Sequence, residues 1–171
     1  LIDISKARLD HVIVGIDLLK HAPGPPDTNI MQVHFMLGDM RVQFDEFELT
    51  NTTFRLDDHS RDTLLPSGMD FKHLLVSDIN IFAENGTVVA DSVLAKVNHL
   101  SAKERSGFQL VKLTTQAQVT TKDITLEKLN LKTPDSEIKD YLSFRFNAYH
   151  DFKDFINAMR IKANLTDSRL T

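Results

Sequence analysis

Hydrophobic and polar positions along the chain repeat a ten-residue pattern, in which two alternating apolar residues precede a polar residue and two more follow it. The pattern reads FELTNTTFRL at residues 47–56 and LLVSDINIFA at residues 74–83, and looser copies occupy residues 7–16, 124–133 and 163–170. We call the central polar residues the anchors; they are His11, Asn51, Asp78, Lys128 and Asp167. The apolar positions change parity at the anchor: they are odd-numbered before Asn51 and even-numbered after it.

This change of parity predicts a β-strand that bulges at the anchor. Side chains of a strand alternate between the two faces of the sheet, so an uncorrected strand would place Phe47 and Phe54 on opposite faces. One extra residue, a β-bulge, returns them to the same face. We therefore expect irregular pairing at or within about two residues of three anchors, Asn51, Asp78 and Lys128.

A two-residue hairpin at the anchor is the alternative, because it would also bring the apolar positions to one side and would pair Leu49 with Phe54. Such a type I′ turn needs positive φ at the residue after the anchor. Bulky or β-branched residues, which resist this geometry, occupy that position: Thr52, Ile79, Val12 and Leu129. We favour the bulge for this reason.

Local turn patterns divide the rest of the chain. Polar or Pro/Gly-rich stretches at residues 21–29, 57–68, 103–107 and 134–135 predict loops and turns between alternating apolar segments. Asn85-Gly86 predicts a type I′ hairpin, and this hairpin would pair Ala83 with Val88 and Ile81 with Ala90.

A single short helix is expected near the end of the sequence. Residues 151–159 combine helical spacing of apolar residues with Asp151 at the N-cap position. The remaining pattern predicts a mainly β fold of antiparallel strands, roughly nine to eleven in number. We expect more than half of the residues to lie in strands.

Composition and charge argue against several classes of protein. The 171 residues are 42% hydrophobic and 26% charged, which is typical of a folded chain rather than a disordered one. The formal net charge of -4 gives no basic excess for binding nucleic acid, and no cysteine is present for a disulfide or a thiolate metal site. Because the chain starts at Leu1 and a strand-like pattern runs to Thr171, we interpret residues 1–171 as one segment of a larger protein.

No catalytic or metal-binding motif occurs in the sequence. The seven histidines are scattered, and neither a zinc-binding helix spacing nor a nucleophile-elbow or phosphate-binding glycine pattern is found. The densest polar cluster lacks the spacing of a calcium loop and is more typical of a solvated loop; it contains Asp57, Asp58, His59, Arg61 and Asp62. We therefore expect no enzymatic activity, no cofactor and no metal.

The bulged strands are expected to keep one face of the sheet apolar. With parity corrected at each anchor, this face carries Phe47, Leu49, Phe54, Leu56, Leu74, Val76, Ile81, Ala83, Val88, Ala90, Ile124, Leu126 and Leu131. An ordinary β-sandwich core would account for such a face, but a sheet bent repeatedly by one device grows in one dimension and leaves its concave face open. An open apolar trough is costly unless an apolar ligand such as an acyl chain occupies it.

Several successive phrases of the sequence resemble a known family. They are FELTNTTFRLDD, GMDFKHLLVSDINI, VNHLSAKERSGFQLVKL and LNLKTPDSEIKDYLSFRF, and they cover most of the chain from about Leu9 onward. The resemblance is to the TamB family of translocation and assembly module proteins, in the form found in Bacteroidetes. These AsmA-like proteins are anchored in the inner membrane by an N-terminal helix. They cross the periplasm as a long curved β-sheet folded into a groove, or β-taco, with an apolar interior.

The resemblance implies that this chain is an internal periplasmic segment of such a groove. It implies a role in phospholipid transport between membranes and in outer-membrane assembly, without catalysis. Phospholipid acyl chains would bind this segment, and an outer-membrane barrel protein would contact other parts of the parent. The expected helix at residues 151–159 departs from an ideal open groove, because it would cap or plug the trough.

Two other functions compete with this one. The first is a structural or protein-interaction β module of the cell envelope that binds no lipid, whose free sheet edges pair with a partner or with further copies of the chain. The second is an enzyme whose site is built from residues distant in sequence. Phospholipid that co-purifies with the chain would favour lipid binding over both.

Overall fold

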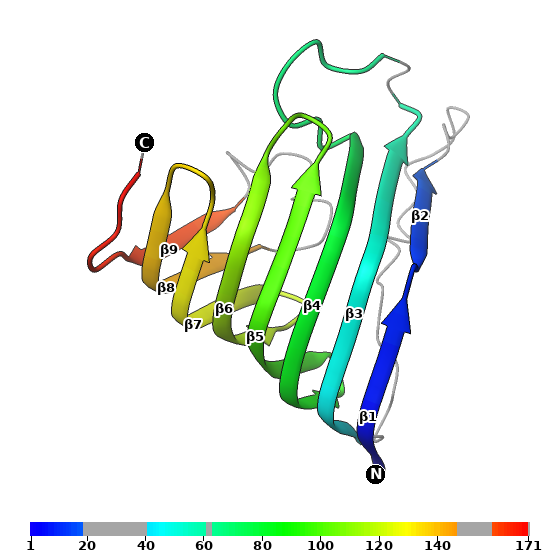
Figure 1. The fold of residues 1–171 in the computed structure, drawn as a ribbon, viewed down its shortest axis with the longest axis vertical. Coiled ribbons are helices and arrows are strands. Elements are labelled where there is room, and N and C mark those ends of the chain that lie inside the picture. Colours follow the sequence, from blue (N-terminus) through cyan, green and yellow to red (C-terminus); the bar gives the residue numbers. More distant parts are fainter. Residues whose placement is uncertain (19–40, 61–62, 147–158, 171) are drawn as a thin grey trace, which may run out of the picture.

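The computed structural model describes residues 1–18, 41–60, 63–146 and 159–170. Strands make up 74% of these residues, and they form a single open, curved sheet of nine strands (Figure 1). The strands are β1 (Ile2–Asp10), β2 (Ile13–Leu18), β3 (Arg41–Asp58), β4 (His73–Val89), β5 (Ser92–Glu104), β6 (Gln109–Val119), β7 (Asp123–Lys132), β8 (Glu137–Arg145) and β9 (Arg160–Asn164). The expectation of a mainly β fold is confirmed.

The strand order is β1-β3-β4-β5-β6-β7-β8-β9, and β2 continues the line of β1 along β3. All pairs from β3 to β9 are antiparallel, as expected, but β1 and β2 run parallel to β3. The expectation of an antiparallel arrangement is therefore wrong at this edge. Alternation of side chains does not encode the direction of pairing, and the long stretch of sequence between Leu18 and Arg41 supplies the length that a parallel connection needs.

All five anchors adopt the left-handed backbone conformation. Their φ angles are 53° at His11, 51° at Asn51, 50° at Asp78, 49° at Lys128 and 52° at Asp167. Strands β3, β4 and β7 run through their anchors without a turn, and the pairing register shifts beside each of them. The prediction of a bulge is confirmed, and the hairpin alternative is wrong. Asparagine, aspartate and histidine tolerate positive φ better than β-branched residues do, which explains their place in the pattern.

Asn85 and Gly86 form a further kink rather than the predicted hairpin. Asn85 has a φ of 51° but lies inside β4. The hairpin turn comes later, at Ala90 and Asp91, between the paired residues Val89 and Ser92. A Cβ atom on Gly86 would overlap the ring of Phe44 on the neighbouring strand. The glycine therefore leaves room for this ring beside the kink. Ala90, which has a φ of 50°, leaves the predicted apolar face for the turn.

Other boundaries differ only slightly from those expected. β3 continues to Asp58 and β5 to Glu104, so the loops predicted from residues 57 and 103 begin later. The helix predicted at residues 151–159 lies almost wholly outside the described residues; Met159, the one described member, is in neither a helix nor a strand. Among the described residues, no helix is long and apolar enough to cross a membrane.

The sheet forms one layer in the part of the chain that the structure describes. The buried hydrophobic residues of this part are Ala83, Leu113, Leu129, Phe146 and Met159, and none of its large side chains is fully buried. A sandwich of two sheets would seal many large side chains in its core. Most apolar side chains of this sheet are instead half-buried or exposed.

Candidate functional site

The strand register assembles apolar residues into rows that cross the sheet. Directly opposite residues on paired strands point to the same side, so each row belongs to one face. One row runs from β1 to β9 through Ile2, Val42, Val88, Val93, Val119, Ile124, Phe144 and Ile161. A second runs from β1 to β8 through Leu9, Leu49, Ile81, Leu100, Leu113, Leu131 and Ile138.

Shorter rows connect the remaining predicted residues. Val14, Phe54 and Val76 are successive partners, as are Ile16, Leu56 and Leu74. Phe47 pairs with Ala7 and Ala83, and Leu126 pairs with Ala117 and Leu142. Except for Ala90, every residue that the sequence assigns to the apolar face therefore belongs to one of these rows.

The bulges place the rows on the same side of the sheet. Val76 pairs with Glu104 and Ile81 with Leu100, so β4 advances one residue more than β5 between these pairs. Glu104 and Leu100 are separated by an even number of residues on β5, so they point to the same face. The extra residue of β4 therefore brings Val76 to the same side as Ile81. Between the pairs Leu126–Leu142 and Leu131–Ile138, β7 likewise advances one residue more than β8, so Leu126 lies on the same side as Leu131. We call this side the apolar face; that it binds lipid stays a prediction.

Ring contacts support the same conclusion on β3. The centroids of Phe44 and Phe47 lie 5.8 Å apart, although an unbroken alternation would direct these two side chains to opposite faces. The strand is irregular between them, because Asp45 lacks a paired residue on both β1 and β4. The parity of the apolar positions thus changes twice along β3, once near Asp45 and once at Asn51.

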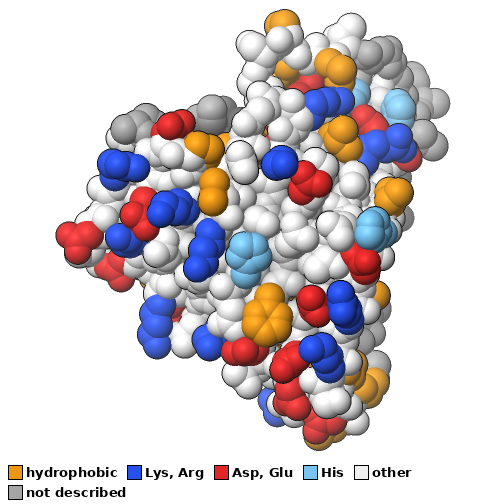
Figure 2. Space-filling model, viewed as in Figure 1, with side chains coloured by type: hydrophobic (Ala, Val, Ile, Leu, Met, Phe, Trp, Pro, Cys, Tyr) orange, Lys and Arg blue, Asp and Glu red, His pale blue; other side chains and the backbone are white. Residues whose placement is uncertain are grey.

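Charged residues pair across neighbouring strands elsewhere on the sheet. Lys6 lies 2.8 Å from Glu46, and Lys96 lies 3.2 Å from Glu84. Figure 2 shows one broad side of the molecule, where charged and polar side chains prevail and hydrophobic ones are scattered. Such a surface is what the side opposite to an apolar face should present to water.

No second sheet covers the apolar face in the part of the chain that the structure describes. Val76 and Ile81, at the centre of the sheet, keep part of their surface in contact with water, and the edge residues Leu9 and Val14 are 48% and 44% exposed. Alternating strands thus bring together a wide surface that is apolar and accessible. A surface of this kind binds other apolar groups because their association removes both from water.

Polar side chains on β5 and β6 also lie buried within the apolar face. Thr115, which is 4% exposed, donates a hydrogen bond of 2.8 Å to the carbonyl oxygen of Glu127 beside the bulge of β7. Glu104, which is 6% exposed, accepts a hydrogen bond of 2.7 Å from the backbone N–H of Ser106. Burial opposes ionisation of Glu104, but the hydrogen bonds from Ser106 prevail and hold the pKa of this carboxyl below its usual value.

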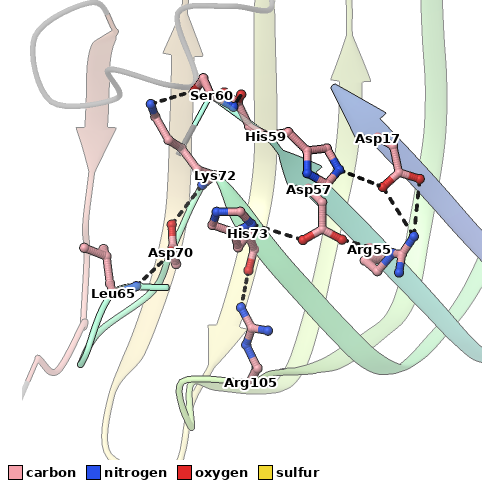
Figure 3. A network of polar contacts seen from close by, with 11 residues as sticks. Asp17, Arg55, Asp57, His59, Ser60, Leu65, Asp70, Lys72, His73 and Arg105 are labelled. Atoms are coloured by element: carbon pink, nitrogen blue, oxygen red, sulfur yellow. Dashed lines mark hydrogen bonds and ion pairs between the residues drawn. The ribbon is translucent and has the colours of Figure 1, made fainter. Parts of the chain in front are cut away.

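A network of polar contacts lies at one end of the sheet, where β3 ends and β4 begins (Figure 3). Asp57 lies between Nδ1 of His73 and Nε of Arg55, at 3.1 Å from each, and Arg55 also contacts Asp17 at 3.3 Å. The backbone N–H of Asp58 donates a 2.6 Å hydrogen bond to the carbonyl of Lys72. These contacts hold the connecting loop against the strand ends.

The polar cluster noted in the sequence lies at this end of the sheet. Asp58 and His73 are 4% and 7% exposed, so this end of β3 is less solvated than the sequence predicts. Arg61 and Asp62 lie outside the described residues. Among the residues that the structure describes, no three histidine or acidic side chains are grouped so that they could hold a metal ion. Within the cluster, Asp57 contacts Arg55 and His73, and His59 lies 3.5 Å from Asp17.

Comparisons with known protein families, curated proteins and solved structures gave no match to this chain.

Proposed function

We propose that this chain is a segment of a periplasmic β-groove that binds phospholipid acyl chains and lets them pass along its apolar face. The observation that carries this proposal is the continuity of the apolar rows from β1 to β9 in a single-layer sheet. A face of this width that is only half-buried needs an apolar partner, and an acyl chain matches it in shape and polarity.

The proposed mechanism is hydrophobic shielding without covalent chemistry. Each methylene group that leaves water for an apolar surface gains about 0.8 kcal/mol, so a chain lying along the rows is held by many small and equivalent contacts. Equivalent contacts at successive rows let the chain move from one row to the next without a deep energy minimum. The phospholipid headgroup stays in water at the open side of the trough.

The larger setting of this segment follows from the resemblance to the TamB family. In this setting the parent protein is anchored in the inner membrane and spans the periplasm, where it serves phospholipid transport and outer-membrane assembly. Other parts of the parent contact the outer-membrane barrel partner.

A charge on the apolar face tests this proposal. Ile81→Lys places an ammonium group in the central row, and Phe82→Lys places the same group on the next residue of β4, which alternation directs to the opposite side. In an open trough the ammonium group introduced by Ile81→Lys still reaches water, so both variants should remain folded. Ile81→Lys should lose most of the phospholipid that mass spectrometry detects with the purified chain, while Phe82→Lys should retain it.

The outcomes separate the proposal from its competitors. If Ile81→Lys abolishes cooperative thermal unfolding and Phe82→Lys does not, then the apolar face is a sealed core and a structural module is the better description. If it remains folded and still carries as much phospholipid as the parent sequence, the face is not the binding surface. Val76→Asp, in a different row, should behave as Ile81→Lys does. In cells that lack the parent protein, a full-length parent carrying either substitution should fail to restore outer-membrane integrity.

A further inference from the structure

Large apolar side chains are exposed on a loop and a turn at one end of the sheet. The loop is residues 63–72, between β3 and β4, and the turn is residues 104–108, between β5 and β6. We call these two segments together the lip. Leu64 is 56% exposed, Leu65 45%, Phe71 46% and Phe108 46%. Neighbouring exposed apolar side chains mark a site of interaction.

The loop and the turn of the lip lie side by side. The backbone N–H of Arg105 donates a 3.0 Å hydrogen bond to the carbonyl of Leu75, and its guanidinium group donates to the carbonyl of His73. Both acceptors belong to the start of β4, which directly follows the loop. Figure 1 shows the loop projecting beyond the strand ends beside the β5–β6 turn, and Figure 2 shows hydrophobic side chains at this end of the molecule.

Hydrogen bonds to one buried residue hold the loop in shape. The carboxylate of Asp70 accepts from the N–H of Leu65 at 2.9 Å and from the N–H of Lys72 at 3.1 Å. The carbonyl of Asp70 accepts from the N–H of His73 at 3.1 Å. The loop is therefore built with its apolar side chains in water. A surface held ready in this way binds a partner without a large cost for ordering the loop.

The exposed charge of the lip is basic. Its acidic residues are Asp70 and Glu104, which are 5% and 6% exposed and accept hydrogen bonds from the backbone. Its basic residues are Lys72, which is half-buried, and Arg105, which is exposed. Apolar side chains beside basic ones match the surface of an anionic lipid bilayer, because the apolar groups enter the acyl region and the cations attract the headgroups.

The lip continues the apolar face to the end of the strands. Glu104 pairs with Val76, and the N–H of Glu104 donates a 2.8 Å hydrogen bond to the carbonyl of Phe108. Phe108 is therefore directly opposite Glu104 and shares its face. It extends the row of Val14, Phe54 and Val76 into the turn, beyond the buried carboxylate.

We propose that the lip inserts into the surface of an anionic phospholipid bilayer, with its apolar side chains among the acyl chains and its basic side chains among the headgroups. In the parent, this contact places the segment within reach of one of the two membranes that the groove connects. The inference goes beyond the proposed function and rests on it only where the lip continues the apolar face. A protein partner fits less well, because a stable interface buries about 800 Å² per partner, more than four half-exposed side chains supply.

Fluorescence of a single tryptophan tests this contact. The chain contains no tryptophan, so an introduced one reports its own surroundings. Leu64→Trp lies in the lip, and Phe82→Trp lies on β4 on the side opposite to the apolar face. With vesicles of phosphatidylethanolamine and phosphatidylglycerol in equal amounts, Leu64→Trp should emit at shorter wavelength and be quenched by brominated acyl chains. Phe82→Trp should show neither change.

Charge substitutions measure how much the lip contributes to vesicle binding. Leu64→Glu combined with Leu65→Glu should weaken binding in vesicle flotation at least about tenfold, because apolar contact is lost and phosphatidylglycerol repels the new charges. Leu94→Glu is the matched control, because Leu94 is 40% exposed near the other end of β5, and it should bind normally. Vesicles of phosphatidylcholine alone should bind the parent sequence more weakly. The unfolding transition of each variant is recorded in parallel.

Ile81→Lys separates this inference from the proposed function. The variant should lose co-purified phospholipid but still float with vesicles, because the lip is unchanged. Loss of vesicle binding in Ile81→Lys would assign the contact to the apolar face and overturn the inference. Vesicle binding through the lip by a parent sequence that carries no co-purified phospholipid would refute the lipid groove and support the lip.

The remaining outcomes also overturn the inference. Normal flotation of the double glutamate variant, or equal quenching of the two tryptophan variants, would show that the lip does not enter the bilayer. Equal binding to phosphatidylcholine vesicles would contradict the part played by the basic side chains. Self-association through the lip without vesicle binding would assign it to a second copy of the chain. Because Leu64→Trp keeps the loop apolar, misfolding of the double glutamate variant does not prevent a decision.

Discussion

Exchange of one anchor residue should reveal how strongly the bends determine the fold. Asn51 has a φ of 51°, and its side-chain amide donates a 3.0 Å hydrogen bond to Asp10 on the neighbouring strand. Asn51→Gly and Asn51→Val both remove this hydrogen bond, but only glycine adopts positive φ without strain. The difference between the two variants therefore isolates the cost of the bend from the loss of the side chain.

The size of the stability change follows from two contributions, the lost hydrogen bond and the cost of positive φ. An exposed hydrogen bond contributes about 0.5–1.5 kcal/mol, which both variants lose. The left-handed conformation costs an ordinary residue about 1–2 kcal/mol, and this cost destabilises the valine variant alone. For a chain of this size, 1 kcal/mol shifts the unfolding midpoint by about 2–4 °C. We expect Asn51→Val to unfold about 2–8 °C below Asn51→Gly in calorimetry.

A control at a regular position of β3 should give the opposite order. Gln43 pairs with Asp3 and Thr87 within uninterrupted parts of the ladder, and its φ is not positive. There, Gln43→Val should be more stable than Gln43→Gly, because strands favour β-branched residues and disfavour glycine. Equal stability of the two Asn51 variants, or a more stable valine variant, would refute the argument that the bend requires this backbone conformation.

Three further substitutions test individual contacts. Gly86→Ala should destabilise the chain by about 1–3 kcal/mol in urea unfolding, because the new methyl group displaces the ring of Phe44, and Phe44→Leu should restore part of the loss. Glu104 has a lowered pKa, so its ionised form stabilises the fold above the ordinary value of 4.5 and this contribution is lost as the pH falls through the folded-state pKa. Glu104→Gln should therefore be less stable than the parent at neutral pH, and the gap should narrow in acid. Lys103→Ala removes an exposed 3.0 Å ion pair with Asp78 and should change stability by less than about 1 kcal/mol.

The bends could be predicted from sequence because two independent features coincide at the anchors. The parity of the apolar positions changes there, and the anchors at His11, Asn51 and Asp78 are residue types that tolerate positive φ. At Lys128 the change of parity alone predicts the bend, whereas a tolerant residue type without a change of parity gives no signal. Asp140 also has positive φ, at 92°, but Ile138 and Leu142 on either side of it keep the same parity.

The apolar face could be predicted only in part. β5 and β6 lack the ten-residue pattern, so Leu100 and Leu113 in the central row had no anchor to mark them. β5 shifts register between Val97 and Leu100 without any residue at positive φ, and such a bulge leaves little trace in residue type. The pairing partners of a strand depend on contacts distant in sequence, which a local pattern does not encode.

The pairing direction of the first strands was also beyond the sequence pattern. Residues of β1 alternate in the same way whether β3 runs parallel or antiparallel to them. Asn85-Gly86 illustrates a different difficulty. Its residue types suit both a hairpin and a kink, and at the observed kink Gly86 leaves room for the ring of Phe44, which lies on another strand.

Photo-crosslinking at two adjacent residues tests the central claim most directly. A benzophenone amino acid at Ile81 lies in the row with Leu49 and Leu100, and the same group at Phe82 lies beside Glu48 and His99 on the other side of the sheet. With the protein in a cell envelope that contains alkyne-labelled phospholipid, we predict lipid adducts at position 81 and few or none at position 82. Adducts of equal yield at both positions, or none at position 81, would contradict the assignment of this face as a lipid track.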